Sequence, residues 1–509
     1  MHIYYGKSHL FNRCVRLDTD EEEEILEVGK RTWEFFKTCM NETNNYLPTD
    51  NYQENRRQKY ANRTSSTNIG FGILAIINAY DLKYITYNEC INNLTNTINT
   101  IFKLEKVNGH LLNWYNIKTL EPLRPRFVST VDSGNFVACM YVLKDFLYTN
   151  KEYNLYKIIE ELIKNTDFTF LYNTSRNLFS IGYLQDEDKL IDSYYDMLMS
   201  ENRITSLIAI ASRQVTSKHW FALARNLINI SGYKGLMSWS GTVFEYYTPY
   251  LFNKSYEHTL IDQTLFFCKY VQQKYLKNKN IPWGISEAGY AIKDDELNYL
   301  YKAFGVPALG LKRGLKDYLV VSPYSSILML EYSPKDVYKN ILKLKKTGLY
   351  STFGFYESID YTKKHLINED FEIIKSYMAH HQGMILTSIN NYINHGIIKN
   401  RFHNNKDIEA CDILLKERER IKAVIKKNKA AVIKREKIID NYTMYICGEQ
   451  LNNEYKPENI EVKPIFLKGK DMYLTLTNFG NTYLRYKDKV INRQEYKRDI
   501  NSRKFCIFN

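Results

Sequence analysis

The chain has 509 residues, of which 44% are hydrophobic and 25% are charged. This composition is typical of a globular protein and excludes a fibrous or largely disordered chain, while the length leaves room for roughly two to four domains. The net charge of +13 would suit an acidic partner, but no nucleic-acid-binding motif accompanies it, so we expect no nucleic-acid partner.

The apolar runs and the cysteines bear on the localisation of the protein. No apolar run is long enough to span a membrane, and the N-terminus has no signal pattern. The eight cysteines are scattered without a CxxC pair, which is typical of reduced thiols rather than of disulfides or a zinc site. We therefore expect a cytoplasmic protein with no metal and no cofactor.

Helical periodicity dominates the first 400 or so residues, with polar, glycine-rich or aromatic loops at alternate joints. We expect helices at about 21–41, 70–80, 86–104, 136–148, 151–164, 185–212, 217–230, 256–277, 334–347 and 368–394, and a further one beginning near 238–246. Around a dozen helices in antiparallel pairs predict a mainly α chain folded as an (α/α)6 barrel. In such a toroid the N-terminal ends of the inner helices line one mouth.

Four segments differ in character along the chain. Residues 1–20 are an irregular lead, and 21–403 form the predicted barrel. Residues 404–460 are a charged linker, whose basic run at 416–437 we expect to be helical and solvated. Alternating residues at 461–509 predict a short C-terminal β segment, which is too small to be a stable β-domain alone.

The stretch from Trp283 to Tyr361 holds the strongest functional signal. Two carboxylates, Glu287 and Glu357, lie there in loops rich in glycine and aromatic residues. A pair of carboxylates beside aromatic rings is typical of a glycosidase, in which one acts as acid or base and the other as nucleophile or base. The alternative is that both are surface glutamates that cap helices.

Six motifs carry a resemblance to a known family. They are Arg31-Thr32-Trp33, Arg63 to Gly70, Val128 to Asn135, Trp283 to Glu287, Phe355-Tyr356-Glu357 and Ala379 to Met384. In this order, over residues 25–403, the chain resembles the central cyclisation domain of the cyclic β-1,2-glucan synthases, a glucoamylase-like transglycosylase of glycoside hydrolase family 189. Related β-1,2-glucanases share its (α/α)6 fold. Residues 471–480 resemble the start of the family-94 β-sandwich that follows in those synthases, and which is truncated here.

This resemblance implies that the chain cleaves an internal linkage of linear β-1,2-glucan and transfers the glycosyl unit to the chain's own non-reducing end. The product is then a cyclic β-1,2-glucan, formed with retention. We expect Glu357 to be the nucleophile and Glu287 the acid/base, although these two roles can be exchanged. The partners implied are the β-1,2-glucan and a separate chain with the family's membrane glycosyltransferase.

Two other functions remain open. The first is an inverting endo-β-1,2-glucanase, in which Asp132 or Glu245 orients a water molecule as the base. The second is an inactive module that only binds glucan. Asp132 and Glu245 each lie at a predicted helix start, so their bland interpretation is helix capping, above all for Asp132.

Further residues are expected to bind substrate, each with a structural alternative. They are Asp132, Glu245, Trp239, Trp283, Tyr356, Tyr361, Lys312, Arg313, His380, His381 and Gln382. The aromatic rings could stack on glucose or belong to the core, and the two basic residues could form a surface turn. Adjacent histidines on a helix point about 100° apart, so we expect them to bind sugar hydroxyls or make structural hydrogen bonds and not to chelate a metal.

Overall fold

The computed structural model describes residues 15–56, 58–294, 297–366 and 369–418, and seven strand segments at 426–427, 444–446, 449–451, 464–468, 472–477, 482–486 and 489–492. The chain divides into two compact units, Met1–Asn428 and Lys429–Asn509. Residues 1–14 of the predicted lead, and most of the predicted linker beyond residue 418, lie outside the described residues. Among the helices that are described, none has the length and hydropathy needed to cross a bilayer.

Helices are the main regular structure of the first unit and far exceed its short strands, which confirms the mainly α prediction. They are α2 (Thr19–Cys39), α3 (Ser66–Asp81), α4 (Tyr87–Lys103), α5 (Thr130–Thr149), α6 (Tyr153–Asn165), α7 (Arg203–Ala211), α8 (Lys218–Ala222), α9 (Val243–Tyr247), α10 (Leu260–Leu276), α11 (Pro323–Ile327), α12 (Pro334–Lys346), α13 (Ala379–Ile393), α14 (Ile397–His403), α15 (Lys406–Ala410) and α16 (Asp412–Leu415).

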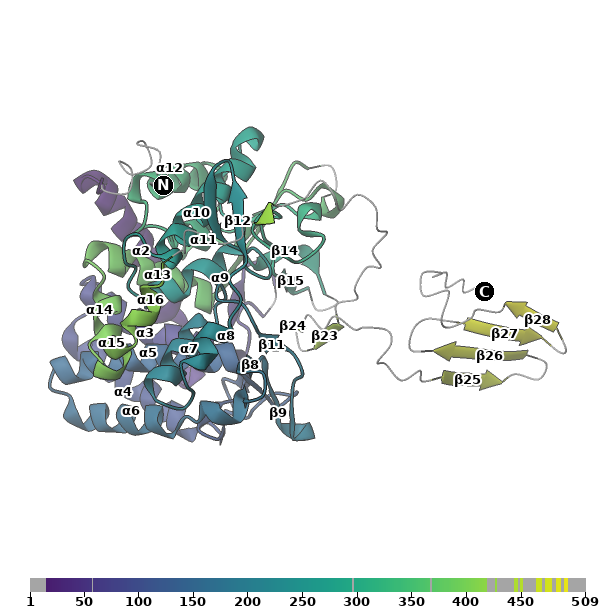
Figure 1. Cartoon of the computed structure of the whole chain (residues 1–509), viewed down its shortest axis with the longest axis horizontal. Coiled ribbons are helices and arrows are strands. Elements are labelled where there is room, and N and C mark those ends of the chain that lie inside the picture. Colours follow the sequence, from purple (N-terminus) through teal and green to yellow (C-terminus); the bar gives the residue numbers. More distant parts are fainter. Residues whose placement is uncertain are drawn as a thin grey trace. The chain divides into compact units, whose positions relative to one another are not determined.

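The odd-numbered helices from α3 to α13 contact one another in a ring. Helix α3 packs on α5, α5 on α7, α9 on α11, α11 on α13, and α13 returns to α3 (Figure 1). Helices α7 and α9 are joined by Arg203, whose Nη2 donates to the carbonyl oxygen of Tyr246 at 3.1 Å. Helices α4, α6, α10, α12 and α14 each pack on the inner helix that precedes them in the chain. This order of contacts is that of the predicted (α/α)6 toroid.

Hydrophobic patterning explains which helices are inside. In α3 every residue from Ser66 to Ala79 is buried, whereas in α6 only Ile159 and Leu162 are buried. A helix that is apolar on all sides is most stable when neighbouring elements surround it completely. An amphipathic helix needs burial of its apolar face only. The inner and outer positions therefore follow from the sequence of each helix.

Polar side chains fix where the inner helices begin. Ser65 caps α3 by accepting a hydrogen bond from the backbone N–H of Asn68 at 3.1 Å. Ser129 caps α5 in the same way for Asp132, at 3.3 Å. The N-cap of α5 is therefore Ser129, and the capping role expected for Asp132 is corrected, because Asp132 lies at the third helical position and its carboxylate is free to point elsewhere.

Short strands connect the helices, and the sequence analysis underestimated them. Strands β10 (Lys189–Leu190) and β11 (Tyr194–Tyr195) lie inside the helix expected at 185–212 and pair antiparallel with β9 (Gly182–Leu184) and β8 (Leu178–Ser180), so that helix shrinks to α7. Strand β21 (Ser376–Met378) pairs with β1 (Asn51–Gln53), so α13 begins at Ala379 and not at 368. Helical periodicity within one segment contains no information about pairing with another strand.

Three further strands position the candidate site. Strand β14 (Ala288–Lys293) forms an antiparallel pair with β15 (Tyr299–Lys302) immediately after Glu287. Strand β19 (Ser358–Asp360) begins immediately after Glu357. Both glutamates therefore immediately precede a strand, and the backbone pairing of that strand fixes their positions.

The second unit contains a four-stranded antiparallel sheet of β25 (Pro464–Lys468), β26 (Met472–Thr477), β27 (Thr482–Tyr486) and β28 (Lys489–Asn492). Strands were predicted from the alternating pattern here, and the β-sandwich of which they would be the start stays a prediction. In the basic run, Lys426 and Lys427 form strand β22, which pairs in parallel with Ile228 and Asn229, so the expected helix is wrong at these two residues.

Candidate active site

The first turns of the inner helices meet at one place. The Thr67 hydroxyl of α3 donates to the Asp132 carboxylate of α5 at 2.5 Å. From α9 the N–H of Phe244, and from α11 the hydroxyl of Tyr324, both donate to Ser286 Oγ, at 3.0 and 2.8 Å. The segment that carries Glu287 is therefore held between two helix starts of the ring.

Glu287 is partly exposed and has one tyrosine on its carboxylate. The Tyr301 hydroxyl donates to Glu287 Oε1 at 2.7 Å, and the Tyr324 hydroxyl oxygen lies 3.0 Å from the backbone carbonyl oxygen of Glu287. Burial raises the pKa of Glu287 to about 7, against the hydrogen bond from Tyr301 that favours the carboxylate. The negative charges of Glu245 and Asp132 raise this pKa further, so Glu287 exchanges a proton near neutral pH.

Glu357, by contrast, is 2% exposed, and both of its carboxylate oxygens have hydrogen-bond partners in the protein. The N–H of Gly289 donates to its Oε1 at 3.1 Å, and His381 Nδ1 lies 3.0 Å from each carboxylate oxygen. Burial raises the pKa of Glu357 to about 8. Both carboxylate oxygens of Glu357 are thus contacted by groups of the protein.

The two histidines lie side by side at the start of α13. The ring of His381 stacks on Tyr324 with centroids 3.6 Å apart and planes at 12°, and its Nε2 is 3.3 Å from the Tyr301 hydroxyl. The neighbouring His380 places Nδ1 3.2 Å from Asn68 Oδ1. Burial lowers the pKa of His381 well below its usual value and that of His380 to about 3, so both rings are neutral. Among the described residues, no three metal-ligating side chains come together.

Glu201 is a site residue that the sequence analysis missed. It is partly exposed and lies two residues before α7. Burial raises its pKa well above the usual range, and the carboxylates of Glu245 and Glu287 raise it further. Because residues 185–212 were expected to form one helix, Glu201 was not distinguished from an ordinary helical glutamate. The available signal was its place between Ser200 and Asn202, which are residue types that favour a helix start.

Asp132 and Glu245 differ in how free their carboxylates are. Asp132 is partly exposed, accepts from Thr67, and has its pKa raised by burial. Glu245 is buried and closes a capping box on α9. Its oxygens accept from the Ser238 hydroxyl at 2.7 Å and from the N–H groups of Ser240 and Thr242 at 3.0 and 3.1 Å. Glu245 is thus a structural residue of the loop that it caps.

Trp239 and the basic pair lie together. The side chain of Trp239 is 46% exposed, and its backbone carbonyl accepts from the N–H of Lys312 at 2.8 Å. The charge of Lys312 lowers the pKa of Glu287, which places the ammonium group in the electrostatic field of the site. Arg313 is exposed next to it. Trp239 and Arg313 are thus the exposed members of this group.

The remaining candidates have partners inside the protein. Trp283 is 8% exposed, with its N–H and carbonyl both bonded to the Asn340 amide at 2.9 and 2.8 Å. The buried Tyr356 donates to Glu54 at 2.7 Å, and the buried Gln382 donates to the Phe355 carbonyl at 3.1 Å. The partly exposed Tyr361 packs its ring 5.7 Å from that of Phe371. Their geometry supports the structural alternative for Trp283, Tyr356 and Gln382.

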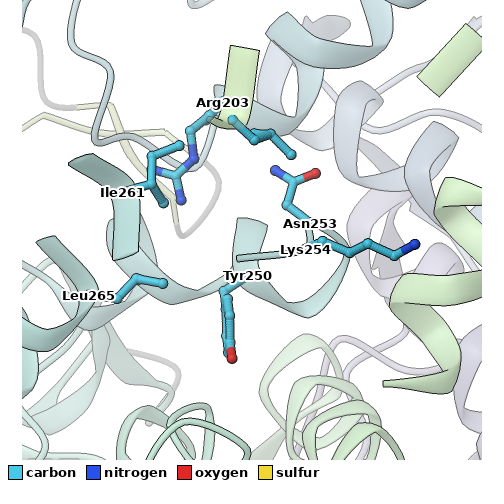
Figure 2. A pocket seen from close by; sticks show the side chains of 7 residues that line it. Arg203, Tyr250, Asn253, Lys254, Ile261 and Leu265 are labelled. Carbon is cyan, nitrogen blue, oxygen red and sulfur yellow. The ribbon is translucent and has the colours of Figure 1, made fainter. Parts of the chain in front are cut away.

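Arg203 supports the segment that carries Glu201. It is 2% exposed and donates to the carbonyls of Leu198 and Tyr246, at 3.4 and 3.1 Å. Figure 2 shows it beside Asn253 at a cavity of about 10 Å³, which is room for about one water molecule and too little for a sugar ring. Burial lowers the pKa of Arg203 to about 10, so the guanidinium stays charged and ties the start of α7 to α9.

The raised carboxyl pKa values predict how stability depends on pH. The folded chain has a pKa of about 7 at Glu287 and about 8 at Glu357, both above the usual 4.5. Between about pH 4.5 and 8 the folded state therefore binds more protons than the unfolded state, and the free energy of unfolding falls as the pH rises. We expect the melting temperature to decrease from pH 5 to pH 8, measured by differential scanning fluorimetry. The Glu357→Gln variant should show a shallower decrease, and a melting temperature that rises over this range would contradict the raised pKa values.

The sequence was compared with family models and curated proteins. Residues 193–406 match the family model Glycoamylase, described as "Putative glucoamylase". The cyclic β-(1,2)-glucan synthase NdvB of Rhizobium meliloti (strain 1021) is 29% identical over 524 aligned residues, which cover 78% of this chain and 18% of that protein. The chain therefore spans less than a fifth of the length of this relative.

Solved structures share the fold. A "putative glucoamylase" from Bacteroides caccae ATCC 43185 superposes with a TM-score of 0.64 and 18% identity, covering 78% of this chain and 99% of that one. The endo-β-1,2-glucanase from Chitinophaga pinensis gives a TM-score of 0.64 and 16% identity, covering 78% of this chain and 98% of that one. The chain thus has the fold of these two proteins, and its residues 193–406 form a glycoamylase-like domain.

Proposed function

We propose that the chain is a glycoside-hydrolase-type enzyme that cleaves β-1,2-glucan and transfers the released glycosyl unit. The observation that carries the proposal is the partly exposed Glu287, with a pKa raised to about 7, among other carboxylates at the helix starts of the ring. The likeness to a cyclic β-(1,2)-glucan synthase and to an endo-β-1,2-glucanase solved with sophorotriose and glucose supports this substrate class.

We assign the nucleophile to Glu287 and the acid/base to Glu201, which revises the predicted pair. A nucleophile has to reach the anomeric carbon, and Glu357 is 2% exposed with donors on its carboxylate. Glu287 is partly exposed, and the Tyr301 hydrogen bond stabilises its ionised form. Burial and the negative charges of Glu245 and Glu287 raise the pKa of Glu201 well above its usual range, so it holds the proton that a general acid must deliver at neutral pH.

The reaction proceeds in two displacements. A Glu287 oxygen bonds to the anomeric carbon as the bond to the O2 atom of the next glucose breaks, and Glu201 gives its proton to that leaving oxygen. In the second step Glu201 takes the proton from an incoming hydroxyl, whose oxygen displaces Glu287 from the anomeric carbon. If that hydroxyl is the 2-OH at the non-reducing end of the same chain, the product is a ring. If it is water, the product is a shorter linear glucan.

Transglycosylation is the first choice because the identity to the synthase is 29%, against 16% to the glucanase. One observation favours a second candidate, an inverting hydrolase. Asp132 is partly exposed in the same carboxylate cluster and is held by Thr67, so it could orient a water molecule as a general base.

We further propose that Trp239 stacks on a glucose ring and that Arg313 binds glucan hydroxyls, because both are exposed, and that Lys312 binds a glucan hydroxyl, because its charge acts on Glu287. An enzyme that only exchanges glycosidic bonds makes no net linkages. A polymerising glucosyl transfer must therefore supply its linear substrate, and we propose a separate membrane glycosyltransferase chain as that source.

Incubation of the purified chain with linear β-1,2-glucan tests the proposed reaction. We expect products lighter than the linear chains by one water molecule in the mass spectrum, because ring closure transfers the glycosyl unit without adding water. Shorter linear chains alone would favour hydrolysis and the role of Asp132. Binding of the glucan without any product, for example by isothermal calorimetry, would contradict the enzyme proposal and leave the inactive binding module. A linear β-1,3-glucan is the matched control.

A further inference from the structure

We infer that Tyr301 is a positioning residue for Glu287, and that the buried pair of Glu357 and His381 decides which acceptor receives the Tyr301 proton. The inference rests on the proposed role of Glu287 as nucleophile. It gives a role to Glu357 and His381, which the proposed reaction does not use.

The hydroxyl of Tyr301 has a choice between two acceptors. Glu287 Oε1 lies 2.7 Å from the hydroxyl oxygen, and His381 Nε2 lies 3.3 Å from it. A tyrosine hydroxyl carries one proton, so it can donate fully to one of them only. The state of His381 Nε2 therefore controls how strongly Tyr301 is bound to Glu287.

The tautomer of His381 follows from Glu357 on its other side. If Glu357 is ionised, His381 Nδ1 carries the ring proton and donates to it, so Nε2 is bare and competes with Glu287 for the Tyr301 proton. If Glu357 is protonated, it donates to Nδ1, and the ring proton sits on Nε2. In this second state Nε2–H donates to the Tyr301 oxygen, and the only acceptor left for Tyr301 is Glu287.

Neighbouring groups fix the orientations of the Glu357 and His381 side chains. The N–H of Gly289 donates to Glu357 Oε1 at 3.1 Å, so Oε2, 3.0 Å from His381 Nδ1, is the oxygen that carries the proton. The His381 ring cannot turn freely, because it is 1% exposed and stacked on Tyr324 at 3.6 Å. Each of these side chains is thus held in one orientation. The row of hydrogen bonds from Glu357 to Glu287 therefore has one direction in each protonation state of Glu357.

Burial favours the protonated form of Glu357 at neutral pH. The titratable and charged groups around it are Asp50 with its ion-pair partner Arg63, His380, Tyr301, Tyr324 and Glu287. Burial raises the pKa of Glu357 to about 8, the charge of Asp50 adds to this, and the nearby His380 opposes it. Below about pH 8 the Tyr301 hydroxyl therefore donates to Glu287 only, and above this pH His381 Nε2 competes with Glu287 for its proton.

Two substitutions separate the positioning role from a purely structural one. Tyr301→Phe removes the donor, so we expect kcat to fall about 10- to 100-fold, the range of a lost hydrogen bond to a charged group. The pKa of the acidic limb of the kcat/KM profile should rise at the same time, because the carboxylate of Glu287 loses its donor. The matched control is Tyr332→Phe, which removes a buried tyrosine hydroxyl that donates to the Asp262 carbonyl at 3.1 Å, and which should leave the profile in place.

Glu357→Gln imitates the protonated state permanently. The glutamine amide can donate to His381 Nδ1 while its carbonyl accepts from Gly289, so the Nε2–H tautomer persists at every pH. We expect kcat within about 10-fold of the wild type, and the decline in rate above about pH 8 should disappear. An acidic limb that stays in place in Tyr301→Phe, or Glu357→Gln as inactive as Glu287→Gln in a folded protein, would overturn the inference.

A spectroscopic measurement makes the test independent of turnover. The ¹⁵N chemical shifts of His381, assigned by comparison with His381→Asn, report which ring nitrogen carries the proton. We expect Nε2–H at pH 6.5 and Nδ1–H at pH 9.5 in the wild type, and Nε2–H at both pH values in Glu357→Gln. Nδ1–H at pH 6.5 would overturn the inference. Expected tautomers in a chain that turns over no β-1,2-glucan would instead overturn the proposed function and leave the proton relay standing.

Discussion

Glu287→Gln should abolish turnover of linear β-1,2-glucan, with a loss of about 10⁴-fold or more in kcat. The amide has almost the size of the carboxyl group and can still accept from Tyr301, so the fold should persist. It cannot form the bond to the anomeric carbon, because an amide oxygen is a poor nucleophile and carries no charge. The rate of product formation, measured by mass spectrometry beside the wild type, gives the loss.

Trapping would identify the residue directly. A β-1,2-linked disaccharide with fluorine at the 5-position of its reducing-end glucose and a fluoride leaving group at the anomeric carbon of that glucose should form a long-lived ester with the wild type. The peptide that contains Glu287 then gains the mass of the glycosyl unit, and Glu287→Gln gains none. The control Glu331→Gln removes a carboxylate that pairs with Lys399 at 2.6 Å, and it should stay active and be labelled. Label on the peptide with Glu357 would restore the pair predicted from the sequence.

Glu201→Gln should lower turnover of the natural glucan by about 10²- to 10⁴-fold, which is the contribution of general acid–base catalysis. A substrate with a good leaving group needs no proton in the first step, so its glycosylation should be much less affected. Added azide should then restore the second step, because this anion attacks the glycosyl enzyme without a general base. The measurements are the rates with a dinitrophenyl glycoside, with and without azide.

The product of that rescue distinguishes the two mechanisms. A glycosyl azide of retained β-configuration is expected for the two-step reaction. Asp132→Asn is the companion variant, and it should keep most of its activity if Glu287 and Glu201 suffice. An inactive Asp132→Asn combined with an inverted product would instead support the inverting hydrolase, and equal loss with both substrates in Glu201→Gln would remove the acid/base role from this residue.

Periodicity predicted the long helices well because their patterns are local. The expected segments 86–104, 151–164, 256–277 and 334–347 correspond to α4, α6, α10 and α12 within a few residues. Each of these helices presents an apolar stripe to an inner helix, and a stripe repeats every 3.6 residues whatever the partner is. Errors arose where a strand partner far along the chain competes, as β1 does by pairing with residues 376–378 of the helix expected at 368–394.

The candidate site was predicted in part, through residue types and motif order. Glu287 lies in the cluster that was expected, and His380 and His381 lie at its edge. Glu201 and Tyr301 were missed, because no local pattern distinguishes a glutamate before a helix or a tyrosine in a strand from many others. Tyr301 is singled out only by its hydrogen bond to Glu287, and Glu201 only by the effect of the Glu287 charge on its pKa.

The sequence by itself determined the helical class and the burial pattern of the long helices, and it indicated Glu287 as a carboxyl group that could do chemistry. These depend on hydrophobic patterning and on side-chain chemistry, which each segment carries alone. The tertiary structure alone decided which carboxyl groups are accessible. Glu287 and Glu357 have similar loops in sequence, but one stays partly exposed while the other is sealed against His381 and Gly289. Burial and pKa depend on neighbours that the fold brings from distant segments, so they exist only once the ring has closed.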